Sequence, residues 1–348
     1  CIRDRVLAID IPTGLHADTG SELGVAVRAA ATLTFIGLKQ GMFTGRGPEC
    51  CGEIHFDALR VPAVVYSREV LSARRLDWHK QSGLLGPRRR DAHKGDFGHV
   101  LVVGGAPGYS GAARLAGEGA LRAGAGLVTV ATHPDHAPYL NANRPELMVR
   151  GVAEPEQLQP LLERCSVISV GPGLDRESWG RALFERVLAS DRPLVVDADA
   201  LNLLAENGVA RRNWILTPHP GEAARLLRRS IAELQADRFG AVRRLQERFG
   251  GVAVLKGAGT LIFGPSRKPP AVCSDGNPGM SSGGMGDVLT GIIAALVAQG
   301  LTLEDAACAG VCVHASAGDA AAAGGERGLL ASDLFEPLRA LLNPGTAS

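Results

Sequence analysis

Short runs of apolar residues alternate with longer stretches of helical periodicity from residue 94 to the end of the chain. The short runs predict strands, and the stretches between them predict helices. Because each run is continuously apolar, the strands are typical of a mostly parallel sheet with helices on both faces, an α/β fold. The predicted strands are Val100–Val103, Leu127–Ala131, Val167–Val170, Leu194–Val196, Ile215–Thr217, Val252–Leu255 and Leu261–Phe263, and the predicted helices are Gly111–Ala123, Trp179–Ala189, Ala223–Arg229, Glu233–Phe249, Val288–Gln299 and Leu303–Ala322.

The chain before residue 72 has a different pattern. Val6–Ile11 and Thr32–Ile36 are predicted strands and a third short strand ends at Phe56, but the helices that such strands need are not evident. The chain also begins without a methionine. We therefore expect residues 1–71 to be a truncated α/β domain of a longer protein. Between residues 72 and 93 the periodicity fades into turn-forming and charged residues, which predicts a linker before a second domain at 94–343.

Chemically distinctive residues follow several strands of the predicted second domain. GGAPGYSG and GPGL follow the first and third strands, DADALNLL the fourth, TPHPGE the fifth, and LKGAGT the sixth. Each alone has an ordinary explanation, with His219 as a surface residue, Lys256 as a solvated lysine and Asp199 as a helix cap. In parallel sheets, however, ligands bind outside the carboxyl ends of the strands. Taken together, these residues predict an active site at that edge of the sheet.

The segment Ser281–Gly300 begins with glycines and continues as a nearly all-apolar helix, with Asp287 at its start. Glycines let backbone N–H groups approach a ligand, and the positive end of the helix dipole favours an anion. A carboxylate beside such a site can take a proton from a hydroxyl group that attacks a phosphoryl group. The alternative interpretation is that Asp287 is only an N-cap and the glycines only a loop.

Composition narrows the function classes. Lys and Arg number 37 against 36 Asp and Glu, and aromatic residues make up 4%, so the chain lacks the basic field and stacking surfaces of a nucleic-acid binder. No apolar stretch is long enough to cross a bilayer, so no membrane partner is expected. Seven cysteines without a CxxC pair favour a reducing, cytoplasmic location, with Cys308 and Cys312 as core residues rather than metal ligands.

Longer motifs resemble known families. KGDFGHVLVVGG, GYSGAARLAGEGALRAGAGLVTV, GPGL, VVDADALNLL, LTPHPGEAARLL, VLKGAGTLI and GNPGMSSGGMGDVLTGIIAAL are similar to the ADP-dependent NAD(P)H-hydrate dehydratases, from about Lys94 to Leu342. That resemblance implies a ribokinase-like fold. VLAIDIPTGLHADTG and TFIGLKQGMFTGRGPECCG are similar to the end of the Rossmann-like NAD(P)H-hydrate epimerase domain. As a whole, the chain resembles the bifunctional NAD(P)H-hydrate repair enzymes, with residues 1–71 as a remnant of the epimerase domain and 94–343 as the dehydratase domain.

The resemblance implies a metabolite-repair lyase. Such an enzyme removes the C6 hydroxyl of the S form of hydrated NADH or NADPH at the expense of ADP, giving AMP, phosphate and the restored cofactor. Asp287 would be the catalytic residue that activates this hydroxyl. The residues implied to contact the hydrated nicotinamide nucleotide are Ala112, Gly173, His219 and Asp287, and those implied to hold the adenine nucleotide are Lys256, Gly257, Ala258, Gly259, Thr260 and Gly286.

The resemblance also implies cofactors and partners. Mg²⁺ is expected with ADP, and Asp197 is a candidate neighbour, although its ligands stay unassigned. In the first block Asp10 matches a substrate residue of the epimerase, and Thr13 stands where that family usually has Ser as a potassium (K⁺) ligand. The upstream substrate loop of the epimerase is missing, so we expect no epimerase activity. The expected partners are small molecules and, in a homo-oligomer, further copies of the chain.

Two alternatives remain open from the sequence. A ribokinase-like small-molecule kinase, of the hydroxymethylpyrimidine or hydroxyethylthiazole type, would use the same glycine loop and Asp287 but release a phosphorylated product. A non-catalytic nucleotide sensor would bind adenine nucleotide without needing a base. TPHPGE together with KGAGT favours the dehydratase over the kinase, and the presence of Asp287 disfavours the sensor.

Overall fold

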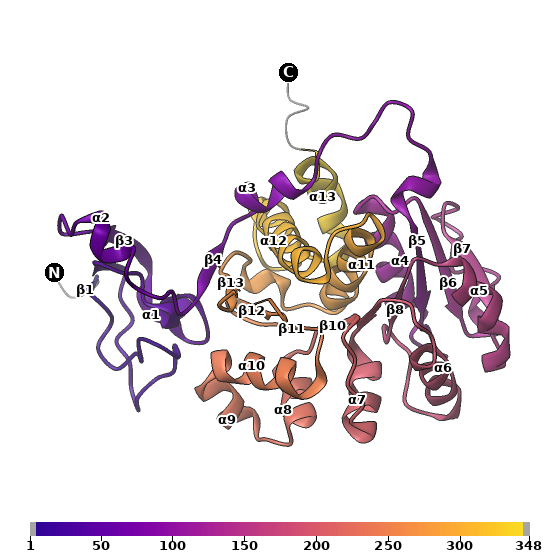
Figure 1. Cartoon of the computed structure of the whole chain (residues 1–348), viewed down its shortest axis with the longest axis horizontal. Coiled ribbons are helices and arrows are strands. Elements are labelled where there is room, and N and C mark those ends of the chain that lie inside the picture. Colours follow the sequence, from indigo (N-terminus) through magenta and orange to yellow (C-terminus); the bar gives the residue numbers. More distant parts are fainter. Residues whose placement is uncertain (1–4, 267, 344–348) are drawn as a thin grey trace.

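The computed structural model describes residues 5–266 and 268–343, so the first four residues of the predicted first block lie outside it. Within these residues the strands form two sheets (Figure 1). The smaller sheet has the order β1-β2-β3, and its neighbouring strands are parallel. Its strands are β1 (Leu7–Ile9), β2 (Ala31–Phe35) and β3 (Glu53–Asp57), and short helices α1 (Gly47–Cys51) and α2 (Ala63–Tyr66) accompany them.

The larger sheet has ten strands in the order β4-β13-β12-β11-β10-β9-β8-β5-β6-β7. Only β12 runs against its neighbours, which confirms the prediction of a mostly parallel sheet. The sequence analysis missed three of these strands, β4, β7 and β13, which lie toward the edges of the sheet. Strands β4 (RRL) and β7 (MVRG) also contain arginines that interrupt an apolar run. The strands are β4 (Arg74–Leu76), β5 (His99–Val103), β6 (Leu127–Thr132), β7 (Met148–Gly151), β8 (Val167–Val170), β9 (Leu194–Val196), β10 (Trp214–Leu216), β11 (Val252–Leu255), β12 (Thr260–Phe263) and β13 (Ala271–Cys273).

Helices cover both faces of the larger sheet, as predicted. Along β5, Val100 and Val102 belong to one buried cluster and Leu101 and Val103 to the other, because successive side chains point to opposite faces. One face carries α4 (Ser110–Arg122), α11 (Met285–Ala298), α12 (Leu303–Ala321) and α13 (Phe335–Leu341). The other carries α5 (Gln159–Arg164), α6 (Ser178–Leu188), α7 (Ala198–Asn207), α8 (Pro220–Leu227), α9 (Ile231–Ala236) and α10 (Arg238–Phe249).

The segment 72–93, which the sequence predicted as a linker, contains a strand and a helix that join the larger domain. Its residues 74–76 form β4, which pairs with β13 at the edge of the larger sheet. The next helix, α3 (Trp78–Gln81), places Trp78 in the core, where it is 9% exposed. Strand β4 has the sequence RRL, which is not an apolar run, so the pattern of apolar residues does not reveal it.

The predicted helix Glu233–Phe249 is two helices in the structure. The chain leaves the helical conformation at Asp237, where φ is −145°. The Asp237 carboxylate accepts a hydrogen bond from the Gly240 N–H group and thereby caps α10. The capping side chain of Asp237 therefore divides the predicted helix in two, although the apolar pattern continues across it. Arg238 becomes the first residue of the second helix.

Helices α4 and α11 pack closely side by side and run in the same direction. Leu115 and Gly119 of α4, and Ala123 directly after the helix, meet Gly284, Val288 and Gln299 in matching order. Glycines allow this approach, since a Cβ on Gly119 would lie 2.8 Å from the Val288 carbonyl oxygen. The amino ends of both helices therefore lie at one edge of the sheet, where their dipoles favour negative charge.

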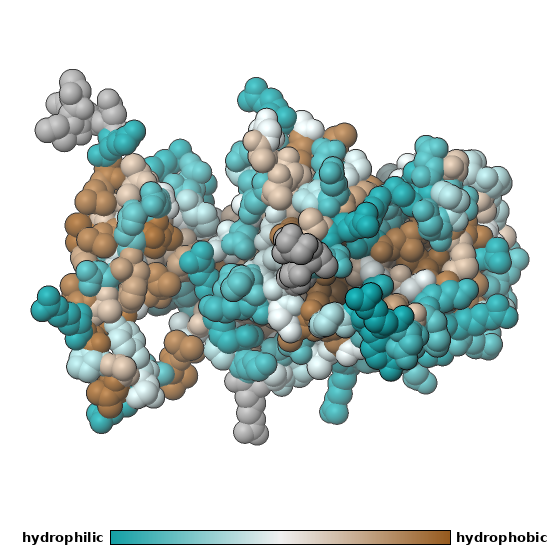
Figure 2. Space-filling model, turned by 90° about the horizontal axis from the view of Figure 1, so that it is seen from above, coloured by the Kyte–Doolittle hydropathy of each residue, from teal (hydrophilic) through white to brown (hydrophobic). Residues whose placement is uncertain are grey.

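The first block leaves much apolar surface uncovered. Leu7 and Ile9 of β1 are 60% and 62% exposed, and Phe56 of β3 is 49% exposed. Figure 2 shows this hydrophobic surface at the end of the molecule formed by the first block. Its opposite side is not free, because Leu15, Phe43 and Cys51 are buried in a cluster that they share with the larger domain.

Candidate active site

The motif-bearing strands lie next to one another in the larger sheet. Its order places β11, β10, β9, β8 and β5 consecutively, and all of them are parallel. The loops at their carboxyl ends therefore form one continuous edge, as the sequence analysis expected. The chain reverses its direction of travel across the sheet between β8 and β5, which makes this point the topological switch of the fold.

Two of the expected substrate residues meet at the switch point. Gly173 has a positive φ of 57°, and a Cβ on it would lie 3.3 Å from the Ala112 Cβ and 2.6 Å from the Tyr109 carbonyl oxygen. Its own carbonyl oxygen accepts a hydrogen bond of 2.7 Å from the Ala106 N–H group. Ala112 lies in the first turn of α4, so this pocket wall is built of backbone and small side chains beside a helix start.

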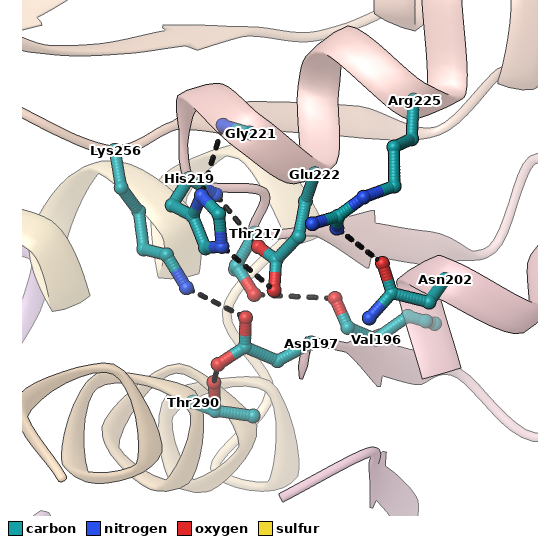
Figure 3. Close-up of polar contacts among 10 residues, drawn as sticks. All are labelled: Val196, Asp197, Asn202, Thr217, His219, Gly221, Glu222, Arg225, Lys256 and Thr290. Atoms are coloured by element: carbon teal, nitrogen blue, oxygen red, sulfur yellow. Dashed lines mark hydrogen bonds and ion pairs between the residues drawn. The ribbon is translucent and has the colours of Figure 1, made fainter. Parts of the chain in front are cut away.

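A buried ion pair lies at the centre of the edge (Figure 3). Lys256 Nζ is 2.6 Å from Asp197 Oδ1, and the two side chains are 18% and 2% exposed. The other carboxylate oxygen of Asp197 accepts a hydrogen bond of 2.8 Å from the Thr290 hydroxyl of α11. Burial alone would lower the pKa of Lys256, but the carboxylates of Asp197 and Glu222 raise it, so the ammonium stays charged.

Asp287 lies in the first turn of α11, three residues after the N-cap Gly284. It is not the N-cap of the alternative interpretation, and within the described residues its carboxyl group has no hydrogen-bond partner. Burial, followed by the negative charge of Asp197, raises its pKa to about 7. A carboxyl group whose pKa lies near neutrality can both accept and release a proton in the working pH range.

His219 and Glu222 lie beside the ion pair (Figure 3), with Glu222 buried and the His219 side chain 51% exposed. His219 caps α8, because its Nδ1 accepts a hydrogen bond from the Gly221 N–H group. Its Nε2 lies 3.5 Å from Glu222 Oε1. Burial raises the pKa of Glu222 to about 7, although Lys256 opposes this shift. Burial and the positive charge of Lys256 lower the pKa of His219, which favours the neutral ring.

The expected nucleotide residues lie in the turn between β11 and β12. Gly257 and Gly259 have positive φ values of 130° and 64°, which only glycine adopts readily. Thr260 begins β12, and its hydroxyl donates to the Gly257 carbonyl oxygen at 3.1 Å. Gly286 of α11 comes close to this turn, since a Cβ on it would lie 3.2 Å from Lys256 Nζ. The turn and the start of α11 therefore border the same ion pair.

The described residues do not by themselves form a magnesium site. No group of three or more His, Cys, Asp or Glu side chains among them could hold a metal ion. Both carboxylate oxygens of Asp197, the candidate neighbour, already have partners in Lys256 and Thr290. Mg²⁺ commonly binds through one or two carboxylates plus substrate phosphates and water. An ion here would therefore depend mainly on nucleotide phosphates.

The two expected epimerase residues lie apart from this edge, in the first block. Asp10 follows β1, and its carboxylate binds the Lys39 ammonium and the Phe35 N–H group. The hydrogen bond from Lys39 holds the pKa of Asp10 below its usual value. Thr13 is exposed in the following turn, where its carbonyl oxygen accepts from the Val27 N–H group. Sequence reasoning did not single out Lys39, which sits within one of the motifs quoted above.

Sequence reasoning also missed two residues of the larger site, Glu222 and Thr290, and it did not predict that Asp197 pairs with Lys256. Glu222 stands at the third position of α8, where an acidic residue usually completes a capping box, and it does so here by accepting from the His219 N–H group. Its burial, at 5% exposed, is what distinguishes it from an ordinary cap. The spacing in TPHPGE signals the cap, but no local pattern signals the burial.

Comparison with known proteins gives the class and then the family. The fold is ribokinase-like: a ribokinase-like superfamily protein from Enterococcus faecalis superimposes with a TM-score of 0.73 at 30% identity, over 79% of this chain and 96% of that chain. The chain belongs to the NAD(P)H-hydrate dehydratase family, whose sequence profile matches residues 100–339. The YjeF-related protein N-terminus profile matches residues 3–41. The family and the fold that the motifs predicted are thus both confirmed.

Two named relatives are similar over most of the chain. A bifunctional NAD(P)H-hydrate repair enzyme from Coxiella burnetii is 53% identical over 340 residues, which cover 97% of this chain and 70% of that protein. The crystal structure of an ADP/ATP-dependent NAD(P)H-hydrate dehydratase from Bacillus subtilis, co-crystallised with ATP and Mg²⁺, has a TM-score of 0.70 at 28% identity, over 78% of this chain and 98% of that chain. None of the helices within the described residues is long and apolar enough to cross a membrane.

Proposed function

We propose that this chain uses ADP to dehydrate the S form of hydrated NADH or NADPH, releasing AMP, phosphate and the restored cofactor. The observation that carries the proposal is the environment of the Asp287 carboxyl group. This carboxyl group is partly buried at the start of α11, has a pKa raised to about 7, and lies beside a lysine and a glycine turn. Fold alone does not define a reaction, so the proposal rests on this group and on the family together.

In the first step Asp287 takes the proton of the C6 hydroxyl as the hydroxyl oxygen attacks the β-phosphoryl group of ADP. The bond from the β-phosphorus to the bridging oxygen breaks, and AMP leaves with that oxygen. The N–H groups at the start of α11 and the Lys256 ammonium stabilise the charge on the phosphoryl group in transit. We also propose that ADP binds as its magnesium complex, in which the ion offsets phosphate charge.

In the second step the phosphate group leaves C6 with its bonding electrons. The ring nitrogen lone pair supports the developing positive charge, and transfer of the C5 proton to solvent water restores the double bond. This step separates the proposal from a kinase, in which the phosphorylated compound would be the product. A hydroxyl group is a poor leaving group, whereas phosphate is a good one. Phosphorylation of the hydroxyl group is therefore the chemical reason for using ADP.

We propose that the two substrates occupy neighbouring parts of the edge. Ala112, Gly173 and His219 contact the hydrated nicotinamide nucleotide, and the turn Lys256–Thr260 with Gly286 holds the adenine nucleotide. The helix starts of α4 and α11 and the glycine turn supply N–H groups for both sets of phosphates. The positive φ values of Gly173, Gly257 and Gly259 support close approach of backbone to ligand at these places.

The direct test follows the restored cofactor. The chain is incubated with hydrated NADH and ADP, and the near-ultraviolet absorbance of reduced nicotinamide is recorded while AMP is quantified. We expect AMP and NADH to appear one for one. A stable phosphorylated product would support the kinase instead, and ADP binding without turnover would support the sensor.

The turnover number should depend on pH with an acidic limb near pH 7. Asp287 must be ionised to accept a proton, and its pKa is raised from 3.8 to about 7, so turnover should rise as pH rises through that value.

The contribution of Asp287 to stability should respond to pH in the opposite sense. The folded chain holds this proton between about pH 4 and 7 while the unfolded chain releases it, so this group's contribution to the free energy of unfolding decreases as pH rises.

Glu222 provides the control for this pH profile, because its pKa is also raised to about 7. Turnover at saturating substrates is measured across pH for the parent chain and for Glu222→Gln. If Asp287 is the titrating group, the limb persists in Glu222→Gln with a modest shift. Loss of the limb in this variant would assign the base to Glu222.

Replacing His219 with alanine should raise the KM for the hydrate more than the KM for ADP, since we place His219 on the nicotinamide side. His219 also caps α8, and a lost cap costs about 1 kcal/mol of stability. His219→Asn separates the two effects because asparagine is a good N-cap but lacks the Nε2 group. A normal hydrate KM in His219→Asn, with a raised one in His219→Ala, would assign His219 to capping alone.

Four finer expectations stay predictions: the missing epimerase activity, potassium at Thr13, a homo-oligomeric state and a cytoplasmic location.

The six cysteines that the structure describes are free and buried, including Cys308 and Cys312. The burial of Cys308 and Cys312 agrees with the core role that their spacing predicted.

A further inference from the structure

The first block lies against the turn that we propose to hold the nucleotide. The contact follows the 3₁₀ helix Gln40–Phe43, at Thr44, which is fully buried. The Thr44 hydroxyl is 3.2 Å from the Ala258 carbonyl oxygen and 3.0 Å from that of Gly259, and it can donate to either. The Gly45 N–H group donates to the Ala258 carbonyl oxygen at 3.1 Å. Two successive residues of the first block therefore bind the backbone of this turn.

Arg238 of α10 binds both the first block and the turn. Its side chain is 1% exposed, and its Nε donates to the Thr44 hydroxyl at 2.9 Å. One terminal nitrogen donates to the carbonyl oxygens of Leu255, Lys256 and Gly259 at 3.2 to 3.3 Å. The guanidinium group thus binds the backbone on both sides of the turn and the first block at once.

The setting of Arg238 is costly for a charged group. Among the described residues it forms no ion pair, and burial lowers its pKa to about 10. A buried charge without a counter-ion is unfavourable unless hydrogen bonds compensate it. All of the partners found for Arg238 are neutral oxygens, namely Thr44, the Gln235 side chain and the three carbonyl groups. Three of them belong to the backbone at the ends of the nucleotide turn.

The fit between turn and first block leaves no space for adjustment. A Cβ on Gly259 would lie 1.8 Å from the Phe43 carbonyl oxygen and 2.6 Å from the Thr44 Cα atom. The turn therefore packs backbone to backbone against the first block. Rigid backbone contacts of this kind hold the backbone of the turn in one position.

We propose that Thr44 and Arg238 are positioning residues that fix the turn Lys256–Thr260 for the nucleotide phosphates, so that the first block sets the ADP affinity of the dehydratase site. This inference rests on the proposed nucleotide role of that turn. Neither residue touches the nucleotide. Because coupling between sites is reciprocal, bound ADP should in turn hold the first block more firmly against the turn.

The test uses Thr44→Val, which keeps the shape of the side chain and removes its hydroxyl. We expect the Kd and KM for ADP to rise about fivefold to tenfold, the effect of losing one buried hydrogen bond and leaving its partners unpaired. The turnover number and the hydrate KM should stay within about twofold of the parent values. Thr44→Ser restores the hydroxyl and should restore ADP affinity.

Thr32→Val is the matched control. Thr32 is also fully buried in the first block, and its hydroxyl donates to the Cys51 carbonyl oxygen at 2.7 Å. It has no hydrogen bond to the nucleotide turn, so its variant should bind ADP normally even if the first block is equally destabilised. An equal loss of ADP affinity in Thr32→Val would overturn the proposal, because any damage to the first block would then be sufficient.

A second measurement does not depend on activity. Amide hydrogen exchange is followed by mass spectrometry for peptides spanning residues 42–47 and 256–260, with and without ADP. We expect ADP to slow exchange in both peptides of the parent chain, and Thr44→Val to weaken both effects. Unchanged exchange and affinity in folded Thr44→Val would overturn the proposal.

The outcomes also separate this inference from the proposed function. ADP binding without dehydration in the parent chain would overturn the proposed function, and the Thr44 comparison would still decide the positioning role. Failure of the parent chain to bind ADP would overturn both.

Discussion

Replacing Asp287 with asparagine is expected to lower turnover by about 10²-fold or more, the usual scale for a lost general base. Asparagine has nearly the same shape, so the fold and ADP binding should persist. It cannot ionise, so the acidic limb near pH 7 should disappear as well. Turnover at saturating substrates, ADP affinity by calorimetry and thermal unfolding are measured on the same preparation.

The same variant should be at least as stable as the parent chain above pH 7. Asp287 is then a partly buried carboxylate in the parent, and Asp197 lies near enough to raise its pKa further. Removing a destabilised charge relieves the folded state, a common consequence of altering an active-site group. A clear loss of stability with normal turnover per folded molecule would mean that Asp287 only supports the helix.

Asp305 offers a control at the equivalent helical position. It is the third residue after the N-cap Thr302 of α12, as Asp287 is the third after Gly284 of α11. An acidic group in a helix first turn stabilises by about 0.3–1 kcal/mol through the helix dipole. Asp305→Asn should therefore show this small loss of stability with normal turnover. A matching fall in turnover would indicate that helix stability, not proton transfer, limits the reaction.

The sequence was sufficient to locate the edge of the sheet that carries the site. Continuous apolar runs gave the central strands, because β8, β9 and β11 are buried on both faces and their bounds match the predicted ones. Glycines with positive φ, such as Gly173 and Gly257, were visible as motifs because only glycine serves there. These features are local, and local patterns are what a single sequence displays.

The pairings across the sheet could not be predicted, because they depend on the register of distant strands. Asp197 and Lys256 are 59 positions apart, and they meet only because β10 alone separates β9 from β11. Thr44 and Arg238 are 194 positions apart. Burial of Glu222 follows from the same packing. The sequence therefore suggested Lys256 as a free phosphate ligand, whereas the structure gives it a buried carboxylate partner.

That partner changes what Lys256→Ala should do. Loss of a charge-assisted contact to phosphate should raise the KM for ADP far more than that for the hydrate, by a factor that corresponds to about 1.5–3 kcal/mol. In addition, Asp197 would be left as an unpaired buried charge, 2% exposed, and breaking a buried pair from one side costs about 3–5 kcal/mol of stability. The melting temperature should fall by roughly 2–4 °C per kcal/mol for a domain of this size.

A second change, Asp197→Asn in the same chain, separates the two effects. Neutralising Asp197 removes the unpaired charge while its Thr290 hydrogen bond can be kept by the amide oxygen. The double variant should therefore recover most of the melting temperature of the parent but none of its ADP affinity, because no ammonium group is restored. Kinetics with each substrate varied in turn, together with thermal unfolding of the two single variants and the double variant, would measure this coupling. Recovery of ADP affinity along with stability would show that Lys256 acts only by neutralising Asp197, and the phosphate contact would then have to come from the N–H groups of the glycine turn.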